Sequence, residues 1–423
     1  MSDKENKPLF SSINEIKKKK LKIQKEEMSG EPYQQTESVA GKSTEDTTTN
    51  KVQEIDESKI SISILIENDE SHDNVITGVG FSSDGKRILS ESEKNTVKLW
   101  DVSTCQELLT LNGRIHETPN ASFSPDGKLV VGGESETLIK YCDTLGGQKY
   151  SFKVQPGDNR DIKVWDASTG KEIFILEGGF THKAPSANFS PDGKRIVGGI
   201  VENSVKVWDA TTGKKILTLE GETNDIYSAW FSSDGKRIVG HIDETTCKVW
   251  DSHTGKEICS FKEYLGWIHF ISSSPDGKHI AVGSIGDVKI FVLDATFDKI
   301  IYNLEGHSDV ILSISFSPNG KLIASGSGDN TIKVWDATSG LEIYTLKGHS
   351  NAVYDVKFSP DGKLIASGSW DNTIKVWDAN SGKEIRTLKG HSDSVQTVSF
   401  SPDGKLIASG SWDNTIKVWE VPQ

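Results

Sequence analysis

Cysteines and long apolar runs are scarce in this 423-residue sequence, and each shortage excludes a class of protein. The four cysteines lie far apart without a CxxC pair, which is typical of reduced thiols and offers no zinc-binding spacing. No apolar run approaches the roughly 18 residues of a membrane-spanning helix, and the opening MSDKENKPLF lacks the apolar core of a secretory signal. We therefore expect a protein of the cytoplasm or nucleus, with no membrane partner, no metal and no other cofactor.

Positive charge is also in deficit. Lys and Arg number 48 against 61 Asp and Glu, which gives a formal net charge of -13. Affinity for phosphate polymers comes mainly from clustered Lys and Arg, so this balance disfavours nucleic acid as a partner.

Residues 1–58 differ in composition from the rest of the chain. They are rich in Lys, Glu, Ser and Thr, and Phe10 and Tyr33 are their only aromatic residues. Such a segment buries too little apolar surface to offset its ordering entropy, so we predict a disordered polar tail. Its basic run KKKKLK, at residues 17–22, is either a solvated charge run or a patch for nuclear import or for an acidic partner.

Internal repetition is what the sequence has in abundance. From residue 71 onward FSPDGK and its variants recur, with their glycines at Gly85, Gly127, Gly193, Gly235, Gly277, Gly320, Gly362 and Gly404. The successive spacings are 42, 66, 42, 42, 43, 42 and 42 residues. A period of this length is typical of repeat architectures, so the sequence predicts eight equivalent units.

Each unit has the pattern of four short strands. VKFSPDG alternates and turns at Asp-Gly, KLIASGS is small and apolar, and NTIKVWD and GKEIRTL alternate again. One such sheet cannot bury both of its faces, so neighbouring sheets must stack, and radial stacking closes them into a ring. The repeated GHS…FSPDGK…SGSxDNTIKVWD pattern resembles the WD-repeat family over residues 59–423. The resemblance implies an all-β propeller of four-stranded antiparallel blades in one domain.

The ends of the repeat region indicate how the ring closes. The last unit ends at TIKVWEVPQ without a fourth strand, whereas KISISILIE, at residues 59–67, is a strand without a unit. In similar propellers an N-terminal strand completes the final blade, which predicts eight blades here, with seven as the alternative. The 66-residue interval holds two candidates for one pair of strands, residues 138–152 and 161–174. One pair fits the blade, and the other is an added hairpin or the remnant of a ninth blade.

Three units contain His, Ser and Asp, the residue types of a nucleophilic triad. A hydrolase needs one such set, whereas these are three equivalent copies, and the sequence has no GxxxxGK[ST], GxGxxG, HExxH or GxSxG motif. In the WD-repeat family these positions and the Trp of the third strand form a structural tetrad, in which each buried polar group has a partner. By resemblance its members are His307, Asp329 and Trp335; His349, Ser367, Asp371 and Trp377; and His391, Ser409 or its neighbour Ser411, Asp413 and Trp419. We therefore expect no catalytic residue among them.

The earlier units depart from this pattern. The first keeps His72 and Trp100 but has Lys94 in place of Asp, and the third has Phe180 and Glu202. We expect the three C-terminal blades to be the rigid sector of the ring.

Tryptophan occupies two kinds of position. Seven occur at the repeat period at the end of a third strand, namely Trp100, Trp165, Trp208, Trp250, Trp335, Trp377 and Trp419, which predicts indoles packed between sheets. Trp370 and Trp412 instead lie in the turn between second and third strands, where the unit before has Gly328. Because the repeat does not require Trp there, and Trp is enriched in binding hot spots, we predict a partner groove on the face bearing the His-containing loops. Its predicted residues are Trp370, Trp412, Tyr354, Trp267, Asn351, Asp393 and Gln396.

A second interpretation of the two exposed tryptophans stays open. The last two units are identical over FSPDGKLIASGSWDNTIKVW, at residues 358–377 and 400–419. Duplication of one unit produces Trp412 from Trp370, in which case both are incidental exposed residues.

The sequence as a whole favours a non-catalytic scaffold or adaptor that binds protein or peptide partners on the propeller face. We expect a monomeric propeller within larger complexes. Since a fold by itself does not establish a function, the alternative is an enzyme or small-ligand binder that uses the central channel. That alternative requires a unique polar cluster at the channel mouth.

Overall fold

Residues Ser63–Gln423 form one compact unit, and the computed structural model describes part of this unit. The described residues are 63–65, 72, 74–92, 96–104, 106–112, 122–133, 162–176, 187–200, 204–220, 228–243, 246–262, 267–285, 288–294 and 300–421. The predicted tail at residues 1–58, with its basic run at 17–22, lies outside them.

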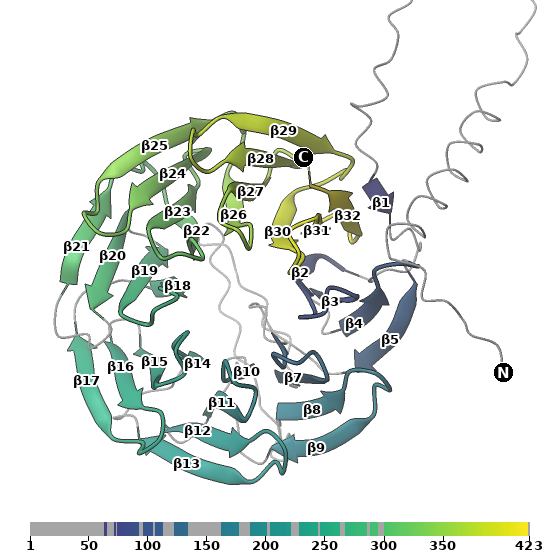
Figure 1. Cartoon of the computed structure of the whole chain (residues 1–423), viewed down its shortest axis with the longest axis vertical. Helices are drawn as coiled ribbons and strands as arrows, with labels where there is room; N and C mark the ends of the chain where they lie inside the picture. Colours follow the sequence, from purple (N-terminus) through teal and green to yellow (C-terminus); the bar gives the residue numbers. More distant parts are fainter. Residues whose placement is uncertain are drawn as a thin grey trace, which may run out of the picture. The chain divides into compact units, whose positions relative to one another are not determined.

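The described part of this unit folds into eight four-stranded antiparallel sheets arranged in a ring (Figure 1). Blade one comprises β2 (Ile76–Phe81), β3 (Arg87–Ser92), β4 (Thr96–Asp101) and β5 (Glu107–Asn112), and blade two comprises β6 (Ser122–Phe123), β7 (Leu129–Gly133), β8 (Ile162–Asp166) and β9 (Glu172–Leu176). Blade three comprises β10 (Ala187–Phe189), β11 (Arg195–Ile200), β12 (Ser204–Asp209) and β13 (Lys215–Glu220), and blade four comprises β14 (Ser228–Phe231), β15 (Arg237–Asp243), β16 (Thr246–Asp251) and β17 (Glu257–Lys262). Blade five comprises β18 (Trp267–Ser273), β19 (His279–Ile285), β20 (Lys289–Asp294) and β21 (Ile300–Glu305), and blade six comprises β22 (Ile311–Phe316), β23 (Leu322–Ser327), β24 (Thr331–Asp336) and β25 (Glu342–Lys347). Blade seven comprises β26 (Val353–Phe358), β27 (Leu364–Ser369), β28 (Thr373–Asp378) and β29 (Glu384–Lys389), and blade eight comprises β30 (Val395–Phe400), β31 (Leu406–Ser411), β32 (Ile416–Glu420) and β1 (Ser63–Leu65). The prediction of an all-β propeller is therefore confirmed, with eight blades and not seven.

The ring closes through a strand from the beginning of the described chain. β1 pairs antiparallel with β32, in the register Ser63 opposite Trp419 and Leu65 opposite Lys417. This pairing supplies the fourth strand of blade eight, as the sequence predicts for residues 59–67. It also covers the β32 edge, which would otherwise present unpaired backbone groups.

The long interval between Gly127 and Gly193 is assigned by the pairing in blade two. β8 pairs with β7 and with β9, so residues 161–174 supply the third and fourth strands of this blade. The other candidate, residues 138–152, lies outside the described residues. Trp165 thus takes the third-strand position in blade two.

The core of the ring lies between neighbouring sheets. The indole of Trp377, in blade seven, packs in one cluster with Ala324, Ile332 and Val334 of blade six. All seven repeat-period tryptophans are at most 5% exposed. Burial of apolar surface between blades is what holds this architecture together, because a single four-stranded sheet has no core of its own.

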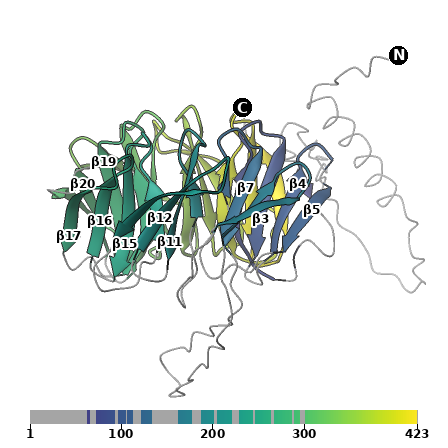
Figure 2. The ribbon, with the colours of Figure 1, turned by 90° about the horizontal axis from the view of Figure 1, so that it is seen from below.

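The strands cross the thickness of the disc, so their connections open alternately on two faces (Figure 2). The turn face carries the FSPDGK turns, in which glycine supplies the left-handed backbone that the turn needs, as at Gly362 (φ 72°). The opposite face carries the connections at residues 348–352, 370–372, 390–394 and 412–414. We call it the histidine face, because His349 and His391, which recur at the repeat period, lie in these connections.

Candidate partner-binding site

Beneath the histidine face lie three side-chain networks of identical geometry. In blade seven, His349 contacts Asp371 Oδ2 through Nδ1 and Ser367 Oγ through Nε2, both at 2.8 Å. Trp377 Nε1 donates to the same Ser367 hydroxyl at 2.9 Å, so one oxygen joins the imidazole to the indole. His349 and Ser367 are buried, which makes a complete set of partners necessary.

Blades six and eight repeat this arrangement with equal distances around the histidine. His307 contacts Asp329 and Ser325, and His391 contacts Asp413 and Ser409, all at 2.8 Å. The serine in blade eight is thus Ser409, and the Ser411 hydroxyl donates instead to Asp393 O at 2.9 Å. These networks fix the connections of the histidine face to the strands below.

The networks hold their carboxylates ionised. Burial by itself raises the pKa of Asp371, but hydrogen bonds from His349 and Thr373 hold this pKa far below its ordinary value. Burial lowers the pKa of His391, while its contact with Asp413 opposes the shift. A neutral imidazole that donates to a carboxylate suits a fixed structural contact.

Blade one has a reduced version of the network. His72 contacts Ser90 Oγ at 2.8 Å and Thr96 Oγ1 at 2.6 Å, so a hydroxyl takes the place of the carboxylate. Burial lowers the pKa of His72 to about 3, and Lys98 adds to the shift. Lys94, which occupies the sequence position of the Asp, lies outside the described residues.

Blades two to five lack the hydroxyl that joins histidine and tryptophan. The position of Ser367 is taken by Gly132, Gly198, Gly240 and Val282, which occupy the fourth place of the second strand. Phe180 and Glu202 lie outside the described residues. The complete networks among the described residues are therefore gathered in blades six to eight.

Trp370 and Trp412 project from tight turns on the histidine face. Each turn is closed by an asparagine in the left-handed region, Asn372 (φ 66°) and Asn414 (φ 64°). The amide of Trp370 donates to Ala352 O at 3.0 Å, and that of Trp412 donates to Ser394 O at 2.9 Å. With the backbone held in this way, the side chains remain 39% and 41% exposed.

Tyr354 and Gln396 occupy equivalent β-bulges at the start of an innermost strand. Val353 and Asp355 pair with successive residues of β27, so Tyr354 is the extra residue of the bulge, and Gln396 lies likewise between Val395 and Thr397. A bulge re-aims the side chain of its extra residue. Here it directs both residues towards the tryptophans.

The bulge residues join the two tryptophans into one aromatic row. Tyr354 stacks on Trp370 with ring centroids 5.8 Å apart and an angle of 18°, and Trp412 lies 5.9 Å from Trp370 at 44°. With the Gln396 amide oriented so that its oxygen faces the indoles, that oxygen accepts from Trp370 Nε1 at 3.1 Å and from Trp412 Nε1 at 3.2 Å. Gln396 is only 7% exposed, so it fixes both indoles from below. The aromatic row is defined as Tyr354, Trp370 and Trp412.

The asymmetry between the last two blades bears on the duplication. The tryptophans are equivalent by position, but the bulge residues are Tyr354 in one blade and Gln396 in the other, and each contacts a tryptophan in its own way. In blade six the bulge residue is Leu312 and the turn residue is Gly328. The two bulge residues lie outside the identical stretches 358–377 and 400–419, so the two blades differ at positions that contact the tryptophans.

The other predicted groove residues lie around the row with different roles. Asn351 Oδ1 accepts from the amide of Ala352 at 2.8 Å, and Asp393 Oδ1 accepts from that of Ser394 at 2.7 Å, so both exposed side chains cap their own loops. Trp267 begins β18 in blade five, two blades away from blade seven, and its side chain lies outside the described residues.

Asp355 is a residue at this site that sequence reasoning missed. Its carboxylate accepts from Ser313 Oγ of blade six at 2.9 Å and from the amide of Val398 of blade eight at 3.0 Å. Lys357 Nζ lies 2.8 Å from it. Asp355 thus joins the innermost strands of three blades beside Tyr354, and a lone Asp in an innermost strand was the only signal.

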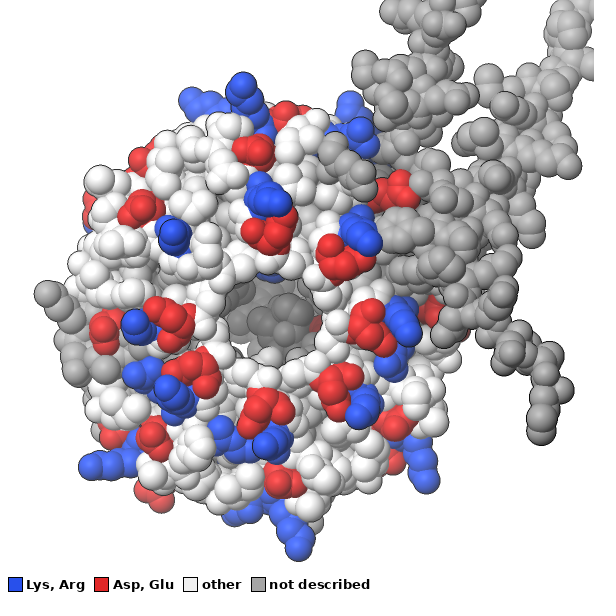
Figure 3. All heavy atoms as spheres, in the orientation of Figure 1, with Lys and Arg blue, Asp and Glu red and all other residues white. Residues whose placement is uncertain are grey.

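Charge is evenly mixed on the face in view in Figure 3. Lys and Arg lie beside Asp and Glu around a central hollow, and neither sign dominates. On the turn face, Lys363 Nζ and Asp361 Oδ2 form an exposed pair at 3.3 Å. The described residues contain no group of three His, Cys, Asp or Glu side chains placed to hold a metal ion. In the same part of the chain, no helix has the length and apolar character to cross a membrane.

Comparison with known proteins identifies repeats of one family. The family model "WD40: WD domain, G-beta repeat" matches residues 64–101, 213–251, 298–336, 340–378 and 382–420. Three consecutive matches cover the sector with complete networks. The stretch between the first and second matches includes blade two and the first three strands of blade three, where the joining hydroxyl is absent.

Relatives and a solved structure agree with this match. Serine-threonine kinase receptor-associated protein of Bos taurus is 29% identical over 62% of this chain and 67% of its own length. An uncharacterised WD repeat-containing protein of Synechocystis is 26% identical over 33% of this chain, which spans less than half (46%) of that relative. The crystal structure of the computationally designed Ika8 protein matches with a TM-score of 0.65 and 27% identity, covering 83% of this chain and 98% of that one.

Proposed function

The chain belongs to the WD-repeat family of β-propellers, and we propose that it is a scaffold that binds a peptide segment of a partner protein at the aromatic row. The family is generally non-catalytic, and its propellers generally bind protein partners. The three Ser-His-Asp sets are consistent with this, because each imidazole and hydroxyl is buried and engaged with its own blade.

One observation carries the proposal. With the Gln396 amide oxygen turned towards the indoles, it accepts from both indole N–H groups of the row, while about two fifths of each tryptophan side chain remains exposed, at 39% and 41%. A partner can therefore cover these rings without supplying an acceptor, and the side chains lose little further freedom on binding. Rigid exposed aromatics of this kind are typical binding hot spots.

The exposed area sets the scale of the expected effect. An indole that buries roughly 250 Å² in full presents on the order of 100 Å² at this exposure. At about 25 cal/mol per Å² the two tryptophans together contribute at most about 5 kcal/mol to binding. Replacement of both tryptophans by alanine should therefore lower the affinity for a partner by roughly 30-fold or more.

Quantitative affinity purification from the native cell, followed by mass spectrometry, tests this function. The double variant Trp370→Ala/Trp412→Ala is compared with wild type and with Ile385→Ala, whose side chain is similarly exposed (43%) on β29. We expect at least one protein that wild type and Ile385→Ala recover equally and that the double variant loses. A photo-crosslinking residue at position 354 should then join that protein to the row. If the double variant recovers every protein at the wild-type level, and its thermal unfolding temperature equals that of wild type, the proposal is wrong.

A further inference from the structure

An arginine bridges neighbouring blades on the turn face at three places in this ring. Arg87, Arg195 and Arg237 each begin the second strand of a blade. Arg195 Nη2 donates to Gly235 O at 3.1 Å, and Arg237 Nη1 donates to Gly277 O at 3.1 Å, each acceptor being the turn glycine of the next blade. Arg87 Nη1 donates to Ala167 O of the next blade at 3.0 Å.

A carboxylate of the same blade accompanies two of these guanidinium groups. Asp84 Oδ2 lies 3.9 Å from Arg87, and Asp234 Oδ2 lies 3.9 Å from Arg237. Arg237 combines both contacts, because its guanidinium lies between an Asp of its own FSPDGK turn and the glycine carbonyl of the next turn, whereas Arg87 shows the first contact and Arg195 the second. It combines charge with hydrogen bonding, which suits the planar donors of arginine.

Blade five has every part of this arrangement except the arginine. Its second strand begins with His279, its turn carboxylate is Asp276, and the turn glycine of blade six is Gly320. No described residue donates a hydrogen bond to Gly320 O. The neighbouring Ala337 O accepts from the Tyr302 hydroxyl.

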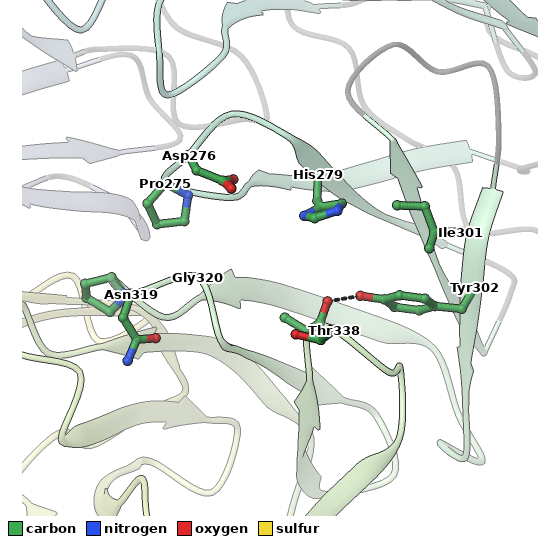
Figure 4. A pocket seen from close by; sticks show the side chains of 10 residues that line it. Pro275, Asp276, His279, Ile301, Tyr302, Asn319, Gly320 and Thr338 are labelled. Carbon is green, nitrogen blue, oxygen red and sulfur yellow. Dashed lines mark hydrogen bonds between the residues drawn. The ribbon is translucent and has the colours of Figure 1, made fainter.

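A cavity of about 470 Å³ occupies this place between blades five and six. Asp276, His279 and Tyr302 lie on the blade-five side, and Gly320 and Thr338 on the blade-six side. Figure 4 shows the two sides facing each other across the opening, with the imidazole short of the opposite turn. Its volume is within the range of pockets that hold small ligands or single side chains.

We propose that this cavity is a binding subsite for an arginine side chain of a partner protein, whose guanidinium bridges Asp276 and Gly320 O as Arg237 bridges Asp234 and Gly277 O. The occupant is identified by the interface between blades four and five, where Arg237 holds a guanidinium at the equivalent place. Lys278 Nζ lies 3.7 Å from Asp276 but is 74% exposed, so it competes only weakly for that carboxylate. The subsite is on the turn face, so it does not depend on the aromatic row.

Titration of the full chain with N-acetyl-arginine methylamide tests the subsite, with the histidine ring signals followed by NMR. We expect a saturable shift of the His279 ring signal with a dissociation constant on the order of 1 mM. The neutral isostere N-acetyl-citrulline methylamide should bind at least about tenfold more weakly, because it lacks the charge. Asp276→Asn should weaken the arginine probe about two- to fivefold. Equal shifts with arginine and citrulline, or no shift at His279, would overturn the proposal.

Two reciprocal substitutions control for the geometry. The arginine introduced by His279→Arg should occupy the cavity itself. The variant should therefore unfold at a temperature a few degrees higher than wild type, and the probe should no longer raise that temperature. Arg237→His should open an equivalent site between blades four and five, and millimolar methylguanidinium should restore part of the lost thermal stability. The Trp370→Ala/Trp412→Ala variant should bind the probe as wild type does, which separates this subsite from the aromatic row. Methylguanidinium that stabilises Arg237→His no more than wild type would contradict the assignment, whether or not His279→Arg folds.

Discussion

The carboxylate of Asp355 offers a sharp test of how the blades that carry the aromatic row are joined. Asp355→Ala leaves the amide of Val398 without its acceptor and removes the partner of the Ser313 hydroxyl, both of which are buried. A buried donor without a partner costs about 1–3 kcal/mol, so the two together should cost roughly 3 kcal/mol. Asp355→Asn keeps an acceptor oxygen for the Val398 amide and offers an NH2 group that the Ser313 hydroxyl can accept from. It loses mainly the charge contact with the half-exposed Lys357, so about 1 kcal/mol is expected.

Native-state hydrogen exchange is the appropriate assay for Asp355, because an eight-blade ring need not unfold in one step. A loss of 3 kcal/mol corresponds to roughly 100-fold faster exchange of the Val398 amide in Asp355→Ala, and 1 kcal/mol to about fivefold in Asp355→Asn. Ser313→Ala is the matched control, since it removes one contact of Asp355 but leaves the Val398 amide bonded. If the Val398 amide exchanges equally fast in Asp355→Ala and Ser313→Ala, the carboxylate does not join these blades as described.

Three further predictions concern the buried networks and the closure of the ring. Asp371→Asn should lower the free energy of unfolding at pH 7 by about 2–3 kcal/mol. Because the pKa of Asp371 is low in the folded state, its contribution to stability is complete above about pH 4. Urea unfolding should therefore show the stability difference between wild type and variant shrinking as the pH falls below that value. The pKa of His72 is about 3 in the folded chain and near 6.5 in the unfolded chain, so the unfolded chain binds more protons between these two pH values. Stability should therefore fall as the pH is lowered from about 6.5. An NMR ring signal of His72 that titrates above pH 5 would contradict this prediction. Removal of residues 1–66 deletes β1 and exposes the edge of β32, so we expect concentration-dependent association in light scattering, which a chain beginning at residue 59 should not show.

The aromatic row shows which of its features could be predicted from the sequence and which could not. Trp370 and Trp412 are recognisable because they occur where the repeat does not require an aromatic residue, and Tyr354 and Gln396 flank them in the predicted loops. The shared acceptor role of Gln396 was not predictable, because it depends on two equivalent bulges that turn residues of neighbouring blades towards one another. The role of Trp267 stays a prediction.

Contacts within a blade follow from the sequence, because they join residues in the strands of one short repeat whose register the turns fix. The period therefore determined the eight units and the buried tryptophans, and the resemblance to the WD-repeat family added the closing strand at residues 59–67 and the residue types of the His-Ser-Asp-Trp networks. Contacts between blades join residues about one repeat period apart or more. Which of these residues come into contact depends on how the closed ring tilts one sheet against the next. Only the tertiary structure decided that residues 161–174 complete blade two, that Asp355 joins three innermost strands, and that His279 leaves a cavity where Arg237 fills its counterpart.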